Sequence, residues 1–308
     1  MKAKTHFLYF LLLIFFLQTI LVSVAASATR IMPLGDSITQ GYIDGLTPEN
    51  ERVGYREKLY SDLVDEGHDV DFVGSQENGL FADPWHEGYN GWTADEIRDS
   101  VYSWLEVNPA DIVLLHIGTN DISGGQSAAD VRDEINEILN EIGDYEFDYS
   151  TEVMVILALI INREDPSSLE GVRTTQLNFF LQSLVNTRYA AGDQIRAVDH
   201  ENALIYPNDM ADPLHPNMTG YHKMADVWFS ALEQILPDPD PPNNPNSDDS
   251  GCFISTATYG LDMEPHVKAP VDFRDHFLLT NFVGRALVDL YHSIRHLRQI
   301  STLDVFIK

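Results

Sequence analysis

Apolar and polar positions follow two alternating patterns between residues 29 and 236. Short runs rich in Val, Ile and Leu have the composition of strands that are buried on both faces. Between them lie longer runs with the mixed pattern of amphipathic helices. This alternation predicts a parallel sheet with helices on both faces. The expected strands are 30–34, 70–74, 111–117, 152–160 and 194–198, and the expected helices are 54–66, 93–107, 127–142, 170–191 and 217–236.

Two of the helix starts carry a capping-box sequence, Thr93-x-x-Glu96 and Ser127-x-x-Asp130. In this motif a hydroxyl and a carboxylate three residues apart satisfy backbone N–H groups that the first helical turn leaves free. In parallel sheets, reactive residues gather at the carboxyl ends of the strands. The chemistry of this chain is therefore expected in the loops that follow the strands.

The first residues have the features of a secretory signal peptide. Lys2 and Lys4 precede an apolar run over 7–24, and the small residues Ala26-Ser27-Ala28 follow it. This order predicts a signal peptide over 1–28 that is cleaved after the last alanine. The alternative is an uncleaved anchor helix, because the apolar run approaches the length of a membrane span. Either way, we expect a secreted or cell-surface attached protein.

The segment 237–250 has the composition of a linker. It contains five prolines and no large apolar residue, so it cannot build a core. Such a segment is typical of an extended, semi-rigid connection. The sequence therefore predicts a main domain over 29–236 and a separate C-terminal module over 251–308.

Composition narrows the function classes. The chain has 308 residues, of which 44% are hydrophobic, enough for one sizeable core. Asp and Glu total 48 against 19 Lys and Arg, so the formal net charge is −29. This charge excludes nucleic-acid binding, which depends on neutralising phosphates, and favours a soluble monomer. The single cysteine excludes a disulfide framework and a cysteine-cluster metal site.

A serine follows the first expected strand directly, in the motif Gly35-Asp36-Ser37-Ile38-Thr39. This position presents the hydroxyl at the carboxyl edge of the sheet, beside a glycine that permits a tight turn. A serine hydroxyl becomes an effective nucleophile only with a general base and an oxyanion hole. The same tripeptide Gly-Asp-Ser also occurs in ordinary turns.

The motif Asp212-Pro213-Leu214-His215-Pro216 precedes the last expected helix. A histidine can accept the serine proton, and a carboxylate three residues earlier can orient the ring and stabilise the imidazolium. One loop is long enough to supply both groups. The alternative is a surface turn ahead of an amphipathic helix.

Two further loops offer hydrogen-bond donors for an oxyanion. Asn120, in Gly118-Thr119-Asn120-Asp121, follows the most apolar strand, and its amide can donate to developing negative charge. Gly91, in the segment 86–92, can expose its backbone N–H. The alternatives are an Asx turn at the first loop and a flexible aromatic loop at the second.

Together the four blocks resemble the SGNH (GDSL-type) hydrolase superfamily, whose Ser, Gly, Asn and His blocks match Ser37, Gly91, Asn120 and His215. The resemblance spans 30–236 and is stronger still to the acetylxylan-esterase-like carbohydrate esterases of family three. It implies the SGNH hydrolase fold, a three-layer α/β/α sandwich with a five-stranded parallel sheet, and ester hydrolysis without a cofactor. The segments that carry it are 31–39, 72–75, 86–92, 116–121 and 214–217.

The resemblance also implies the role of each residue. Ser37 attacks the ester carbonyl, His215 moves the proton, and Asp212 orients the histidine. The N–H groups of Ser37 and Gly91 and the side chain of Asn120 form the oxyanion hole. The expected function is a secreted serine esterase that deacetylates a polysaccharide such as xylan. The alternatives are a GDSL-type lipase or lysophospholipase, and a non-catalytic carbohydrate-binding module.

Several neighbours of these blocks have two interpretations each. Tyr42, Trp85 and Trp92 can stack on a sugar or pack within their loops. Asp36 and Asp121 are expected to order their loops rather than to react.

Three other histidines are expected outside the chemistry. His116 lies within a strand and is expected to be a hydrogen-bonded core residue. His200 and His222 lack the spacing of metal ligands, and we expect no catalytic metal.

The C-terminal residues have a resemblance of their own. The segments 251–260 and 273–287 resemble the CFI-box module that ends many exported bacterial proteins. This resemblance implies attachment or sorting at the cell surface through a sorting partner, with Cys252 as the modification site. The alternative is a small, mostly helical appendage in which Cys252 is a buried thiol.

Overall fold

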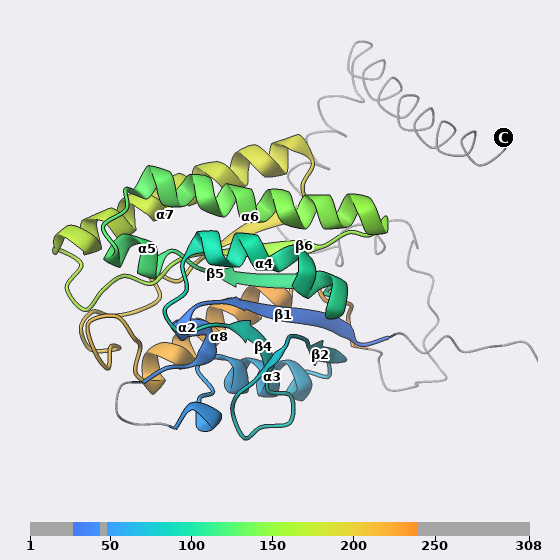
Figure 1. The fold of residues 1–308 in the computed structure, drawn as a ribbon. Helices are drawn as coiled ribbons and strands as arrows, with labels where there is room; N and C mark the ends of the chain where they lie inside the picture. The colour runs from blue at the N-terminus through green and yellow to red at the C-terminus, as the bar shows by residue number, and fades with distance from the viewer. Residues whose placement is uncertain (1–26, 44–47, 240–308) are drawn as a thin grey trace, which may run out of the picture. The chain divides into compact units, whose positions relative to one another are not determined.

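The structure is a computed structural model that describes residues 27–43 and 48–239 (Figure 1). These residues all belong to the first of two units, which ends at Pro239. Most of the expected signal peptide, most of the expected linker and the whole C-terminal module with Cys252 lie outside the described residues. Within the described ranges, no helix is long and apolar enough to cross a membrane.

The five expected strands are confirmed, and all of them run parallel. The expectation of a five-stranded sheet is nevertheless incomplete, because the described residues form seven strands. The additional strands are β3 and β4, which pair antiparallel with each other and have no apolar run to announce them. The strands are β1 (Thr29–Gly35), β2 (Val70–Phe72), β3 (Gln76–Glu77), β4 (Trp85–Gly88), β5 (Ile112–His116), β6 (Met154–Leu159) and β7 (Ile195–Asp199).

Two short strands share one edge of β1. β2 pairs with β1 from Thr29 to Ile31, and β4 pairs with it at Leu34 and Gly35. On the other side, β1 pairs with β5, followed by β6 and β7. The carboxyl end of β1 is therefore enclosed between β4 and β5.

The expected helices are confirmed, and they cover both faces of the sheet. Figure 1 shows α4, α6 and α7 on one face and α3 and α8 on the other, which makes the three-layer sandwich. Single-turn elements after β1 and β5 were not expected from the pattern. The helical elements are α2 (Ser37–Gln40), the 3₁₀ turn η1 (Glu49–Glu51), α3 (Arg56–Asp65), α4 (Ala94–Val107), α5 (Thr119–Ser123), α6 (Ala128–Tyr149), α7 (Leu169–Ala191) and α8 (Met218–Leu232).

Helix α6 is longer than its pattern predicted, because it continues past 142 to Tyr149. Tyr145 is buried and extends the apolar stripe by one turn beyond Ile142. The helix ends at Ser150, whose φ of 50° is left-handed. The buried stripe therefore outweighs Gly143, which is a poor helix former.

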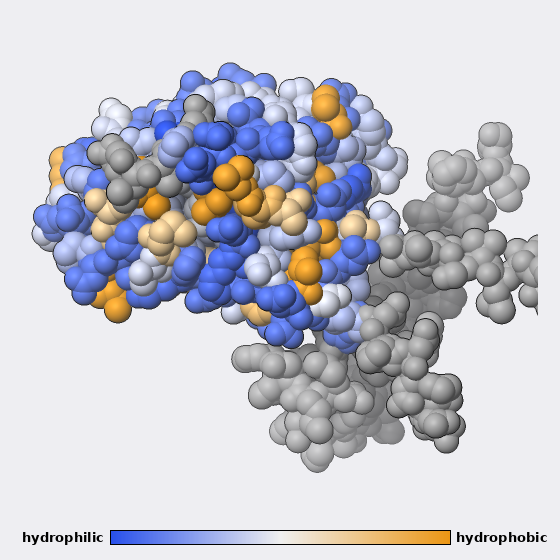
Figure 2. All heavy atoms as spheres, turned by 90° about the horizontal axis from the view of Figure 1, so that it is seen from below, coloured by the Kyte–Doolittle hydropathy of each residue, from blue (hydrophilic) through white to orange (hydrophobic). Residues whose placement is uncertain are grey.

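The surface of the described unit is rich in hydrophilic residues, as expected from the acidic composition. Seen from below, the described unit is mostly hydrophilic, with hydrophobic residues in small, separate groups (Figure 2). Scattered apolar residues of this kind are normal on a soluble protein. The apolar side chains are concentrated instead in the sheet, where every residue of β5 is buried.

Candidate active site

Ser37 is the first residue of α2, immediately after β1. Asp36 caps this helix by accepting a hydrogen bond from the N–H of Ile38 at 2.9 Å. At Gly35 a Cβ atom would lie 2.1 Å from the carbonyl oxygen of His116, so only glycine fits between β1 and β5. The backbone N–H of Ser37 stands at a helix start, where amides lack acceptors within the helix.

The structure brings the three predicted residues Ser37, His215 and Asp212 together. Ser37 Oγ lies 2.9 Å from His215 Nε2, although the two residues are far apart in the sequence. On the other side of the ring, His215 Nδ1 lies 2.8 Å from Asp212 Oδ2. The side chains of His215 and Asp212 are 14% and 18% exposed. The arrangement is a continuous chain of hydrogen bonds from a carboxylate to a hydroxyl.

The carboxylate of Asp212 is fixed by its own loop. Its Oδ1 accepts hydrogen bonds from the backbone N–H groups of Leu214 and His215, at 2.8 and 2.9 Å. Burial by itself raises the pKa of Asp212, but these hydrogen bonds and the His215 ring outweigh burial and hold the pKa below its usual value. Asp212 is therefore ionised at neutral pH.

The two other aspartates near this loop have different partners. Asp209 forms an ion pair with Lys223 at 2.6 Å. Asp199 accepts a hydrogen bond from the side chain of Asn202 at 2.7 Å. The geometry therefore favours Asp212 as the partner of His215.

Gly91 lies on the loop between β4 and α4 with a φ of 84°, a conformation that favours glycine. In the described part of the chain, its N–H has no hydrogen-bond acceptor. The loop is attached to the serine turn, because Gly88 pairs with Gly35 and the N–H of Tyr89 donates to the Gly35 carbonyl at 3.0 Å.

Asn120 is joined to the same loop. Its Nδ2 donates to the Trp92 carbonyl at 2.8 Å, which leaves the second N–H of the amide for another acceptor. The next residue, Asp121, accepts a hydrogen bond from the N–H of Ala94 at 2.9 Å. These hydrogen bonds bring the predicted Gly91 and Asn120 loops into contact. Because β4 and β5 flank β1, both loops also adjoin the turn that carries Ser37.

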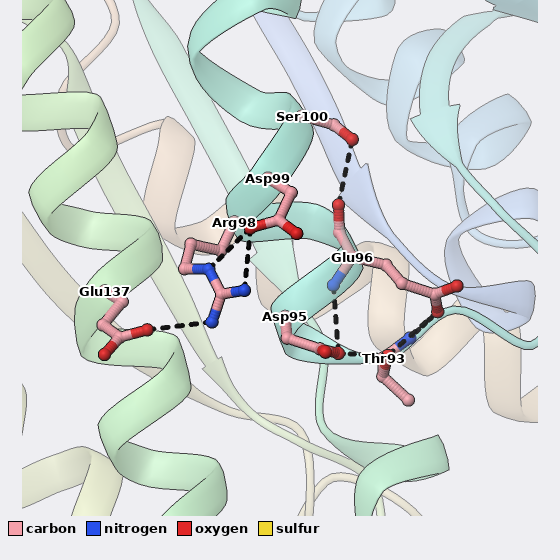
Figure 3. Close-up of polar contacts among 7 residues, drawn as sticks. All are labelled: Thr93, Asp95, Glu96, Arg98, Asp99, Ser100 and Glu137. Atoms are coloured by element: carbon pink, nitrogen blue, oxygen red, sulfur yellow. Dashed lines mark hydrogen bonds and ion pairs between the residues drawn. The ribbon is translucent and has the colours of Figure 1, made fainter.

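The start of α4 is fixed just after Gly91 (Figure 3). Thr93 and Glu96 form the predicted capping box, in which the N–H of Thr93 donates to the Glu96 carboxylate at 2.9 Å. One turn later, Arg98 joins α4 to α6 by an ion pair with Glu137 at 2.9 Å. These contacts limit the freedom of the loop that precedes the helix.

The three aromatic residues predicted near the site occupy different places. The Tyr42 ring lies 4.5 Å from the His215 ring, so it forms part of the wall of the site. Trp92 is stacked on Tyr89 at 4.2 Å, which covers one of its faces. Trp85 is 39% exposed and lies at the amino end of β4, away from the edge that carries Ser37. Sugar stacking by these residues stays a prediction.

Two buried groups beside the chemistry have shifted pKa values. Burial raises the pKa of Asp36 to about 7, and the charge of nearby Asp121 adds to the shift. Burial lowers the pKa of His116 to about 4, so its ring is neutral. The His116 Nε2 accepts a hydrogen bond from the N–H of Ile161 at 3.3 Å, which agrees with the expected core role.

The sequence reasoning missed Arg56, which is fully buried behind the serine turn. Among the described residues, all acceptors of its guanidinium are backbone carbonyls, including those of Thr39 at 3.0 Å and Gln40 at 3.1 Å at the end of α2. The other acceptors are the carbonyls of Arg52, Asn78 and Pro84. The sequence contains one indication that Arg56 is buried, because its spacing places it on the same helical face as Leu59 and Leu63.

In the ranges that the structure describes, no cluster of three or more His, Cys, Asp or Glu side chains could hold a metal ion.

Residues 34–223 match the family model of the GDSL-like lipase/acylhydrolase family. The chain belongs to this family. It therefore has the SGNH hydrolase fold, and the family resemblance of the four sequence blocks is confirmed.

A curated relative and several solved structures are similar to the chain. A multidomain esterase of Ruminococcus flavefaciens is 29% identical over 262 residues; the match covers 75% of this chain and only 32% of that protein. A Clostridium thermocellum family 3 carbohydrate esterase is 28% identical, with a TM-score of 0.59 and coverage of 68% of this chain and 98% of the other. A Talaromyces cellulolyticus family 3 carbohydrate esterase is 26% identical, with a TM-score of 0.56 and coverage of 67% and 97%.

Proposed function

We propose that the protein is a secreted serine esterase that removes small acyl groups, acetyl above all, from a polysaccharide such as xylan. The hydrogen-bonded chain from Asp212 through His215 to Ser37 is the observation that carries this proposal. It stands at the sheet edge where parallel α/β proteins hold their ligands. The similarity to carbohydrate esterases supports the choice of a sugar ester.

The geometry supports a nucleophilic mechanism. His215 Nε2 takes the proton of Ser37 as the serine oxygen attacks the ester carbonyl, and the fixed Asp212 carboxylate stabilises the imidazolium that forms. The imidazolium then protonates the leaving alcohol, so an acyl group stays on Ser37. Water, activated by the same histidine, hydrolyses this acyl-enzyme and restores the serine.

The negative charge on the carbonyl oxygen needs donors during both steps. The N–H groups of Ser37 and Gly91 and the second N–H of the Asn120 amide are the donors we assign to it. One preorganised donor of this kind contributes about 3 kcal/mol to transition-state stabilisation. Because two of these donors belong to the backbone, their positions depend on the turns at α2 and before α4.

Acetate release by the full mature chain tests the proposal. We expect hydrolysis of p-nitrophenyl acetate and acetate release from acetylated xylan. Ser37→Ala should lower kcat by about 10⁶-fold, as for other triad serines. The matched control is Ser100→Ala, because Ser100 lies on α4 and its hydroxyl donates to the Glu96 carbonyl, one turn earlier on the same helix. Activity above a tenth of wild type in Ser37→Ala, with an unchanged circular dichroism spectrum, removes the serine from this role.

Acyl chain length separates the proposal from its alternatives. Faster hydrolysis of p-nitrophenyl decanoate than of the acetate would favour a lipase or lysophospholipase. Binding of xylan without hydrolysis of any ester would favour a carbohydrate-binding module.

We also propose export, on the signal-like sequence of 1–28, and a monomeric state, on the net charge of −29. Protein recovered from the culture medium should begin at Thr29, which N-terminal sequencing checks. Light scattering of that protein should give the mass of one chain.

A further inference from the structure

One arginine at the rim of the candidate active site, Arg52, has no carboxylate partner among the side chains that the structure describes. The guanidinium carbon of Arg52 lies 4.6 Å from the centre of the Tyr42 ring. The same Tyr42 ring lies 4.5 Å from the ring of His215. The Tyr42 ring therefore contacts both this cation and the histidine that faces Ser37. Both Arg52 and Tyr42 are partly exposed to solvent.

Carboxylates are abundant in this chain, where acids outnumber bases 48 to 19. Among the side chains that the structure describes, which exclude those of 44–47 and Glu49, Arg52 has no ion-pair partner, and its buried Nε has no acceptor. The buried Arg56 and Arg163 of the same ranges donate to backbone carbonyls, and six other basic residues have carboxylate partners. These are Arg30, Lys58, Arg98, Arg132, Arg188 and Lys223.

The guanidinium is held in place by neutral groups. Its Nη1 donates to Gln40 Oε1 at 2.7 Å, and the Gln40 side chain is buried. The backbone is fixed as well, because the Arg52 carbonyl accepts a hydrogen bond from Arg56 at 2.9 Å. Arg52 is therefore a preorganised fork of donors whose charge no described side chain neutralises. Such a fork matches the two oxygens of a carboxylate.

We propose that Arg52 determines specificity by binding a carboxylate of the substrate, so that the preferred ester is an acidic polysaccharide with a uronic acid near the acylated sugar. This inference rests on the proposed esterase function. A local cation is needed for such a substrate, because a net charge of −29 repels anionic polymers at long range. At about 0.15 M salt the Debye length is about 8 Å, so distant repulsion is screened while a direct contact persists.

The test compares one polymer in two charge states. Acetylated glucuronoxylan is assayed beside the same polymer whose uronic carboxyl groups have been reduced to alcohols. Acetate release by the full mature chain gives kcat/KM for each polymer. A charge-assisted contact predicts a preference of about tenfold for the acidic polymer, expressed mainly in KM.

Two variants of Arg52 and one control complete the experiment. Arg52→Gln should bring the preference from about tenfold to about one, because it removes the charge. Arg52→Lys keeps the charge without the fork and should give an intermediate preference, which also covers a failure of the glutamine variant to fold. The control Arg132→Gln should keep the full preference, because Arg132 pairs with Asp133 on α6.

Equal kcat/KM of the wild type on both polymers overturns the proposal. So does a preference that persists in folded Arg52→Gln. A wild type that hydrolyses p-nitrophenyl acetate but shows no preference leaves the esterase function standing and removes only the role of Arg52. A wild type that hydrolyses no ester overturns the proposed function itself, and this inference with it.

Discussion

The turn that carries Ser37 and the helix that follows Gly91 adjoin the same sheet edge, but they are stabilised in different ways. α2 has four residues, all buried, and depends on buried polar partners such as Asp36 and Arg56. α4 has 14 residues, an apolar stripe and exposed ion pairs. A single helical turn cannot sustain itself, whereas a long amphipathic helix is stabilised by burial of its apolar face. Substitutions of polar residues should therefore be severe around α2 and mild on α4.

The largest effect is expected for the hydrogen-bonded series Asp212, His215 and Ser37, which ends on α2. Asp212→Asn should lower kcat by about 10⁴-fold, because the amide no longer stabilises the imidazolium or selects the correct tautomer. Ester hydrolysis measures the loss, and Asp133→Asn, on α6, serves as the control. If Asp212→Asn is nearly as active as the wild type, Asp209 or Asp199 must supply the carboxylate.

The next effect concerns the buried guanidinium behind the serine turn. Arg56→Met should lower the free energy of unfolding by at least about 3 kcal/mol, because five backbone carbonyls lose their donor in a buried place. Burial lowers the pKa of Arg56 to about 10, so the group is still charged at neutral pH. Urea denaturation measures the change. A loss below about 1 kcal/mol would put Arg56 on a level with an exposed ion pair and break the comparison.

The third prediction uses pH. The pKa of Asp36 is raised to about 7 in the folded chain, so its neutral form adds stability at low pH that is lost as pH rises through that value. Asp36→Asn cannot ionise and keeps an oxygen to cap Ile38. The free energy of unfolding of the variant relative to wild type should therefore rise by about 1.4 kcal/mol per pH unit between pH 4 and 7 and level off above.

Asp133→Asn is the matched control for Asp36→Asn, because Asp133 is exposed on α6. Its stability relative to wild type should show no such slope. Parallel curves for Asp36→Asn and wild type would mean that Asp36 ionises freely.

The smallest effect is expected on α4. Arg98→Gln removes the ion pair with Glu137 that joins α4 to α6, and the Glu137 side chain is 54% exposed. The loss of stability should stay below about 1 kcal/mol, because water and salt screen an exposed pair. A double-mutant cycle with Glu137→Gln isolates the pair. A coupling as large as the effect of Arg56→Met would contradict the contrast between the two regions.

The fold could be predicted from the sequence where a periodic pattern extends over several residues. The five parallel strands and the long helices were expected for this reason. β4 escaped because Trp-His-Glu-Gly has no apolar run, and α2 because one turn is shorter than the helical period can reveal. α6 exceeded its expected length because a buried tyrosine extends its stripe.

Within the candidate site, the sequence indicated which reactive residue types are present, but not most of the contacts that hold them. A hydroxyl, an imidazole and a carboxylate are recognisable in the sequence. Their proximity was expected because reactive residues gather at the carboxyl edge of a parallel sheet. The partners of Arg56 are backbone carbonyls, which any residue supplies, so no sequence pattern marks them. The neighbourhood of Arg52, Tyr42 and His215 depends on how the segments after α2 and before α8 pack, which periodicity does not encode.

Two separate strands, β2 and β4, pair with the same edge of β1, so the connection between them can vary while both pairings are kept. β2 ends at Phe72 and β4 begins at Trp85, and each strand has its own register on β1. The connection between them reaches the surface at Leu80, which is 80% exposed. Residues inserted at this tip would leave both registers, and hence Gly91, in place. A longer loop inserted there would change the surface beside the sheet and leave the turn that carries Ser37 unchanged.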